Sequence, residues 1–93
     1  MLIGLLEVEL YIPNCNSLKE KRFVLKSLKT KLRNRFNISV TESDGHDLWQ
    51  RAKILVVTVS NDGASANSTL SKVVNFIDAD RRVQLLDYKL SFR

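Results

Sequence analysis

Residues 2–12 are rich in apolar residues, and from Leu6 onward apolar and polar residues alternate, which predicts a β-strand with one buried face. Residues 13–16, which read Pro-Asn-Cys-Asn, interrupt the alternation. Ser17 is followed three residues later by Glu20, which is the spacing of a helix capping box. A helix is therefore expected to begin at Leu18.

Apolar residues then recur at spacings of three and four up to Phe36, as in an amphipathic helix: Leu25, Leu28, Leu32 and Phe36. Residues 38–43 alternate again and predict a short edge strand, and the β-branched run at 51–60 predicts a buried one. A second amphipathic helix is expected to end near Ala79, and a last strand to cover residues 83–92.

The order strand, helix, strand, strand, helix, strand predicts a single α+β domain over residues 1–93 with a ferredoxin-like βαββαβ fold. Its sheet would be four-stranded and antiparallel, in the order 4-1-3-2, with both helices on one face. The first and third strands would then be neighbours, which places Glu9 and Tyr11 near Arg51 and Lys53.

The sheet face without helices would carry an apolar patch, which favours a homodimer interface. The residues predicted for it are Ile3, Leu5, Leu55, Val57 and Val59, with Leu85 as a further candidate.

Basic residues concentrate in the first predicted helix, which holds eight of the fifteen lysines and arginines of a chain whose formal net charge is +5. Five of them follow spacings of three and four and should share one stripe: Lys19, Arg22, Lys26, Lys29 and Arg33. A solvated face usually mixes signs, so a stripe of one sign favours an anionic partner such as the phosphates of RNA. An acidic protein or a membrane surface could use the same stripe.

The rest of the chain offers little chemistry. Cys15 is the only cysteine, so neither an internal disulfide nor a cysteine-based metal site is expected. The turn that holds Asp44, His46 and Asp47 is better explained as a polar turn than as a metal site, and Trp49 as a loop anchor. An active site built from Glu42, His46 or Asp47 is the least favoured alternative. No cofactor and no catalytic activity are expected. The apolar start lacks a basic flank and no apolar run is long enough to span a bilayer, so a soluble, cytoplasmic protein is predicted, without a membrane partner.

Three blocks of sequence resemble the YlxP-like family of small bacterial proteins. They are residues 17–22 (Ser-Leu-Lys-Glu-Lys-Arg), residues 36–40 with Glu42, and residues 48–52 (Leu-Trp-Gln-Arg-Ala). The resemblance implies a ferredoxin-like fold and, through the translation and ribosome-maturation genes that usually accompany the family, a role near ribosomal RNA. It supplies no reaction. Carried over onto this chain, it adds Lys21 to Lys19 and Arg22 as RNA contacts, although Lys21 could instead pair with an acid such as Glu42.

Two hypotheses follow. The first is an accessory RNA-binding factor of ribosome assembly or translation, which binds ribosomal RNA or ribosomal subunits through the first helix. The alternative is a homodimeric protein-interaction module that uses the apolar face of its sheet and has no nucleic-acid role.

Overall fold

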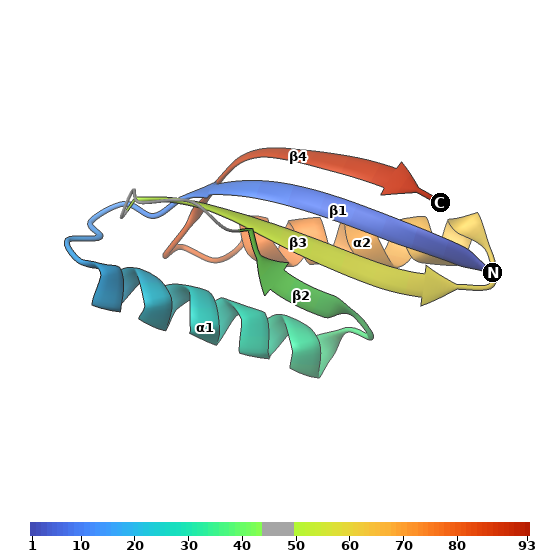
Figure 1. Ribbon diagram of the computed structural model, residues 1–93, viewed down its shortest axis with the longest axis horizontal. Coiled ribbons are helices and arrows are strands. Elements are labelled where there is room, and N and C mark those ends of the chain that lie inside the picture. The colour runs from blue at the N-terminus through green and yellow to red at the C-terminus, as the bar shows by residue number, and fades with distance from the viewer. Residues whose placement is uncertain (44–49) are drawn as a thin grey trace.

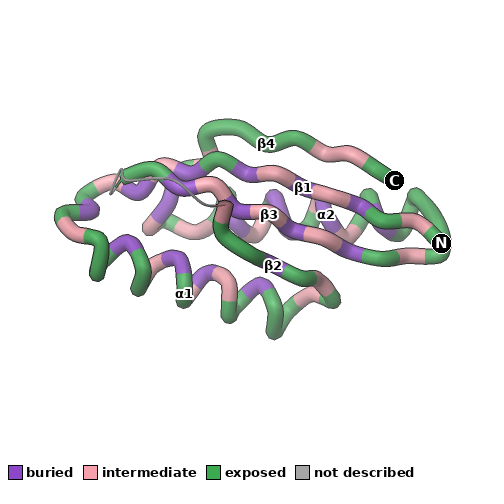
Figure 2. Tube along the Cα trace, in the orientation of Figure 1, coloured by how far each residue is buried: buried purple, intermediate pink, exposed green. Residues whose placement is uncertain are grey.

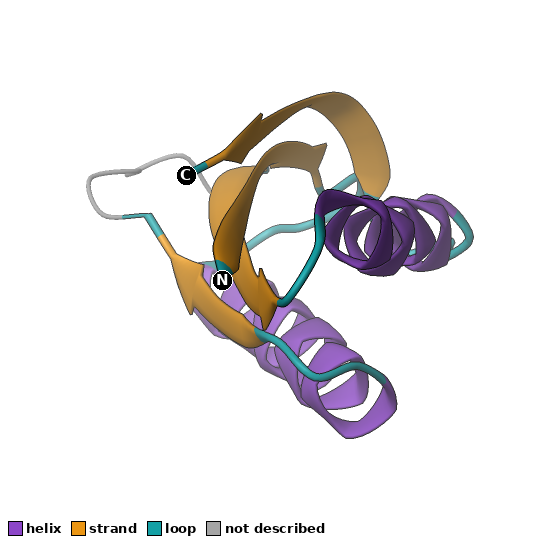
Figure 3. Ribbon diagram, turned by 90° about the vertical axis from the view of Figure 1, so that its right-hand side faces the viewer, coloured by secondary structure: helices purple, strands orange, loops and turns teal. Residues whose placement is uncertain are grey.

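The chain forms six regular elements, seen in a computed structural model that describes residues 1–43 and 50–93 (Figure 1). They are β1 (Leu2–Tyr11), α1 (Leu18–Arg35), β2 (Ser39–Glu42), β3 (Arg51–Ser60), α2 (Gly63–Asp78) and β4 (Gln84–Phe92). The strands form one antiparallel sheet in the order β2-β3-β1-β4, which is the predicted order 4-1-3-2 in reverse. Both helices lie on the same side of this sheet (Figure 3), so the predicted ferredoxin-like fold is confirmed.

The core lies between the sheet and the two helices, and the two central strands supply much of it. Every second residue of β1 from Leu6 to Leu10 is fully buried, as are Ile54 and Val56 of β3 (Figure 2). The helices complete the core with the apolar residues at spacings of three and four: Leu25, Leu28 and Leu32 on α1, and Leu70, Val73, Val74 and Ile77 on α2. The alternating pattern thus determined which strand faces meet the helices.

The start of α1 is capped as its sequence predicts. The Ser17 side chain accepts a hydrogen bond from the Glu20 N–H at 3.2 Å. The Glu20 carboxylate in turn accepts from the backbone N–H of Asn16 at 2.9 Å, one residue before the usual partner in a capping box. These two hydrogen bonds fix the start of α1 relative to the loop at residues 12–17.

One prediction about β4 is wrong. Glu9 is paired with Asp87, but Leu10 is paired with Leu85, so Leu86 is an extra residue in a β-bulge. The bulge reverses the side-chain alternation, and Leu85 therefore packs against the core instead of lying on the open face. Farther along β4, Tyr88 and Phe92 lie on the helix side yet remain 48% and 42% exposed, because β4 is at the edge of the sheet.

A salt bridge fixes the connection between α2 and β4. The Arg82 guanidinium donates to both carboxylate oxygens of Asp80, at 3.1 and 2.8 Å, and to the Ser27 hydroxyl of α1 at 3.1 Å. The hydrogen bonds from the Arg82 side chain hold the pKa of Asp80 below its ordinary value of 3.8. The hydrogen bond from Arg82 to Ser27 thus links the connection between α2 and β4 to α1.

Replacing Asp80 by Asn should lower the free energy of unfolding at neutral pH by about 1 kcal/mol, because a charge-assisted hydrogen-bond pair is lost. The folded-state pKa of Asp80 is depressed, so its stabilisation is present above the ordinary pKa and disappears as the pH falls through the folded-state pKa. Urea unfolding of the native chain and the variant should therefore differ at neutral pH and converge in acid. Asp78→Asn, which removes an exposed carboxylate of α2, is the control; an equal effect of both substitutions would contradict the prediction.

Candidate nucleic-acid interface

The predicted basic stripe of α1 lies along the flank of the helix that is next to β2. Leu25, Leu28 and Leu32 are fully buried and fix the rotation of α1 about its axis. The stripe residues follow a neighbouring row on the helix surface, and two of them contact β2 directly. The tertiary structure divides the stripe into two parts with different surroundings.

The carboxyl-terminal part of the stripe is engaged by the protein itself. The Lys29 ammonium forms a salt bridge with the Glu42 carboxylate at 2.8 Å, and its side chain is only 20% exposed. The Arg33 guanidinium donates to the backbone carbonyl of Val40 at 2.7 Å. Lys29 and Arg33 therefore hold the short strand β2 against α1, which limits their availability to a partner.

Replacing Arg33 by Ala should loosen β2 selectively. Val40 would lose a charge-assisted hydrogen bond to its carbonyl, while the buried contacts of α1 with the rest of the sheet would remain. Hydrogen exchange should become several-fold faster for the amides of β2 and stay unchanged in β1, because local openings are governed by local contacts. Arg22→Ala, on the same flank but without a hydrogen bond or salt bridge to residues 39–42, should leave both strands unaffected; uniform acceleration in all strands would contradict the assignment.

The amino-terminal part of the stripe is exposed. Lys19, Arg22 and Lys26 are all solvent-exposed, and within residues 1–43 and 50–93 none of them takes part in a salt bridge. At the rise of an α-helix the three span about 10 Å, the axial length of about three phosphates on one strand of a duplex. These three residues are called the basic patch below.

Lys21 lies apart from the basic patch, because it belongs to the buried side of α1. Its residue is only 7% exposed, and it neighbours Leu25 and Leu28 on the helix face that meets the sheet. The burial favours a structural role. The acid considered as its partner, Glu42, accepts from Lys29.

The opposite flank of α1 faces α2. The guanidinium of Arg35 lies 5.5 Å from the centre of the Phe76 ring, and Phe76 in turn meets Phe36 edge to face at 6.0 Å between ring centres. These contacts join the ends of the two helices. Cations thus lie on both flanks of α1. The basic patch is the place where three exposed cations follow one another along the same flank.

The open face of the sheet carries the predicted apolar patch at one end and paired charges at the other. Ile3 is paired with Val59 and Leu5 with Val57, and Leu55 adjoins them on β3. Ile3 and Val59 are 42% and 54% exposed. At the other end Glu9 lies 3.7 Å from Arg51 and Glu7 lies 3.6 Å from Lys53, so the predicted neighbourhood of β1 and β3 is confirmed.

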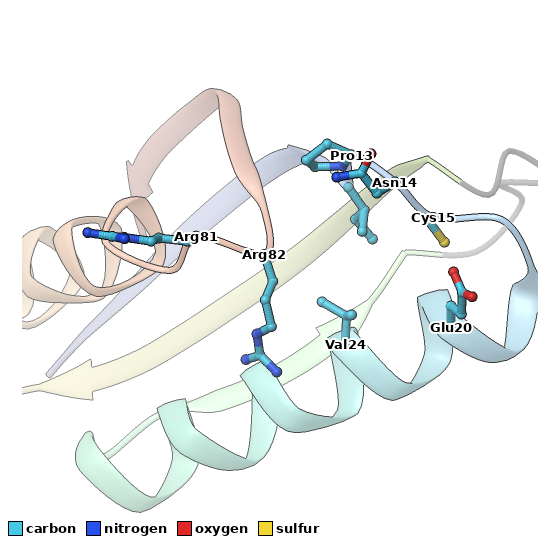
Figure 4. A pocket seen from close by; sticks show the side chains of 8 residues that line it. Pro13, Asn14, Cys15, Glu20, Val24, Arg81 and Arg82 are labelled. Carbon is cyan, nitrogen blue, oxygen red and sulfur yellow. The ribbon is translucent and has the colours of Figure 1, made fainter.

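A cavity of about 320 Å³, which the sequence did not indicate, separates the loop after β1 from the connection between α2 and β4 (Figure 4). Three of its polar side chains already have partners: Glu20 accepts from the Asn16 N–H, Arg82 binds Asp80 and Ser27, and the Cys15 thiol donates to the Ser17 carbonyl. Arg81 points away toward α2. The cavity therefore lacks a convergent set of free reactive groups.

The remaining polar candidates lie at residues 44–49, outside the described part of the chain: Asp44, His46, Asp47 and Trp49. In the described part, no three side chains of the metal-binding types come together. None of the helices in residues 1–43 and 50–93 is both long and apolar enough to cross a membrane.

Phe23, which was not among the predicted site residues, is 70% exposed on α1 beside the basic patch. Its position gave a signal, because Phe23 falls outside the spacing of the buried leucines and thus on the polar side of the helix.

The architecture and the candidate site together define a small ferredoxin-like domain with a basic helix. The chain belongs to the family described as "Protein of unknown function (DUF503)", whose model matches residues 3–90. It is 40% identical over 78 residues to the uncharacterized protein YlxP of Bacillus subtilis (strain 168), covering 84% of this chain and 85% of that protein. The predicted resemblance to the YlxP-like family is confirmed.

Two solved structures share the fold. A de novo designed protein with a ferredoxin fold, LFR1 1, aligns with a TM-score of 0.58 at 12% identity, over all of this chain and 84% of the designed one. The structured domain of Drosophila melanogaster Boca aligns with a TM-score of 0.52 at 17% identity, over 94% and 95% of the two chains. At such identities the likeness concerns the fold alone.

Proposed function

We propose that this protein is a non-catalytic RNA-binding accessory factor of ribosome assembly or translation, and that it docks α1 on RNA phosphates. The observation that carries the proposal is the basic patch: Lys19, Arg22 and Lys26 are exposed on one flank of a helix and, in the described part of the chain, have no acidic partner. Lys29 and Arg33 contribute by holding that helix in place.

The physical basis is the release of counterions. A cation that neutralises a phosphate frees a condensed ion, so affinity falls as salt rises, with a logarithmic slope near −0.7 per phosphate on a single strand. Three contacts predict a slope of about −2. Because α1 is anchored by buried leucines and by its bonds to β2, the three cations are presented together on a rigid support.

The choice of ribosomal RNA or ribosomal subunits is supported by the translation and ribosome-maturation genes that usually accompany the YlxP-like family, to which this chain is similar. The basic patch supports binding to the phosphates of RNA in general.

Co-sedimentation of the native chain with ribosomal subunits and their precursors, across a salt series, tests the proposal. We expect association that weakens steeply with salt, and more association with one assembly state than with the others. Association that does not respond to salt, or no association at any salt, would contradict phosphate docking.

A second candidate, homodimerisation through the open sheet face, is favoured by a different observation. Ile3 and Val59 are half exposed side by side, and the charges at the other end of the face are paired with one another, so the face presents little net charge to a second copy. Light scattering should then give a dimer that Val59→Lys converts to monomer, while Asn67→Lys on α2 does not. A monomeric native chain would exclude this candidate.

A further inference from the structure

Phe23 is the most exposed aromatic side chain among residues 1–43 and 50–93, at 70%. It does not join the core, and it has no ring contact with the aromatic pair of Phe36 and Phe76. A phenyl ring that is exposed to this extent contributes little to folding, because most of its apolar surface stays in water. Its position is therefore better explained by a contact outside the chain than by packing within it.

The surroundings of Phe23 are cationic. Lys19 precedes it by four residues and Lys26 follows it by three, and residues at these spacings are neighbours on a helix surface. Both belong to the basic patch. The Phe23 ring thus lies between two ammonium groups along the helix axis. The third cation of the basic patch, Arg22, is the residue directly before Phe23.

A shallow hollow adjoins the ring. It has a volume of about 410 Å³ and is lined by Lys19, Glu20, Phe23 and Val24. The Glu20 carboxylate accepts a hydrogen bond from the Asn16 N–H and so is held at the helix start. The hollow therefore combines an exposed phenyl ring with the side chains of Val24 and Lys19, which suits a flat and partly apolar group whose attached charge is negative.

We infer that Phe23 is a stacking platform for an unpaired base of RNA, whose flanking phosphates are bound by Lys19 and Lys26. Bases stack on aromatic side chains in single strands, loops and bulges, where they are not already stacked on both sides, whereas a continuous duplex offers only its backbone. The inference rests on the proposed function and adds a class of substrate to it: RNA with an unpaired segment. It makes Phe23 a determinant of preference for single strands, and the cations determinants of overall affinity.

Fluorescence anisotropy with a labelled oligouridine and with an RNA duplex of the same length tests the inference. Phe23→Ala should weaken binding of oligouridine by roughly 5- to 150-fold and leave duplex binding and the salt slope nearly unchanged, since base stacking is lost and phosphate contacts are kept. Phe23→Trp should retain affinity, whereas Phe23→Leu should not restore it. Phe92→Ala, which removes an exposed ring of β4, is the matched control.

The failure of this inference is distinguishable from the failure of the proposed function. Oligouridine binding that depends on salt but is equal in the native chain, Phe23→Ala and Phe23→Leu would overturn stacking and leave phosphate docking intact. No binding of either RNA by the native chain would overturn both. Since Phe23 is exposed, circular dichroism should show the same fold in every variant.

Discussion

Charge reversal of the basic patch, in the triple variant Lys19→Glu, Arg22→Glu, Lys26→Glu, is expected to lower the affinity for RNA by about 100-fold or more at physiological salt. A cation near an anionic surface contributes about 1 kcal/mol, and about 1.4 kcal/mol corresponds to a factor of ten, so the loss of three cations alone gives this order of magnitude. Repulsion by the new carboxylates adds to the loss. The salt slope should flatten at the same time, because fewer counterions are released.

The control carries the same change of net charge elsewhere on the surface. Lys72, Arg81 and Lys89 are exposed on α2, on the connection that follows it and on β4. Their triple replacement by glutamate should weaken binding much less, through the long-range field alone. Equal losses in the two variants would show that net charge, and not the basic patch, governs binding.

Leu28→Ala is expected to give the largest loss of stability among the substitutions considered, about 2–5 kcal/mol. Leu28 is fully buried between α1 and the sheet, so its truncation removes apolar contacts and leaves a cavity. A small domain has a free energy of unfolding of about 5–15 kcal/mol, so the variant would keep a fraction of its stability or unfold. Urea unfolding followed by circular dichroism measures the difference.

Leu18→Ala makes the same chemical change on the same helix at a site that is 42% exposed, and should cost well under half as much. Leu28→Met, which conserves the volume of the side chain, should cost less than about 1.5 kcal/mol. A small effect of Leu28→Ala, equal to that of Leu18→Ala, would contradict the packing of α1 on the sheet.

Local patterns were sufficient for most of the fold. The alternation in β1 and β3 fixed which residues are buried, and the neighbourhood of Glu9 with Arg51 and Lys53 followed from the topology. The cap of α1 followed from Ser17 and Glu20, because such caps involve only neighbours in sequence.

Other features of the fold depend on pairing across the sheet. The bulge at Leu86 placed Leu85 on the core side of the sheet. No residue type in β4 predicts this bulge, because the register is set jointly by two strands. The partial exposure of Tyr88 and Phe92 likewise depends on how far α2 extends under the edge strand, which the pattern within β4 cannot give.

The candidate site shows the same division. The sequence by itself determined that five cations share a stripe of α1, because that follows from 3.6 residues per turn. Only the tertiary structure decided that Lys29 and Arg33 bind β2, that Lys21 is buried, and that Lys19, Arg22 and Lys26 stay exposed beside Phe23. The reason is physical: helical periodicity sets the angles between side chains on one helix, whereas the rotation of that helix against the sheet, and the position of β2 beside it, result from packing between segments distant in sequence.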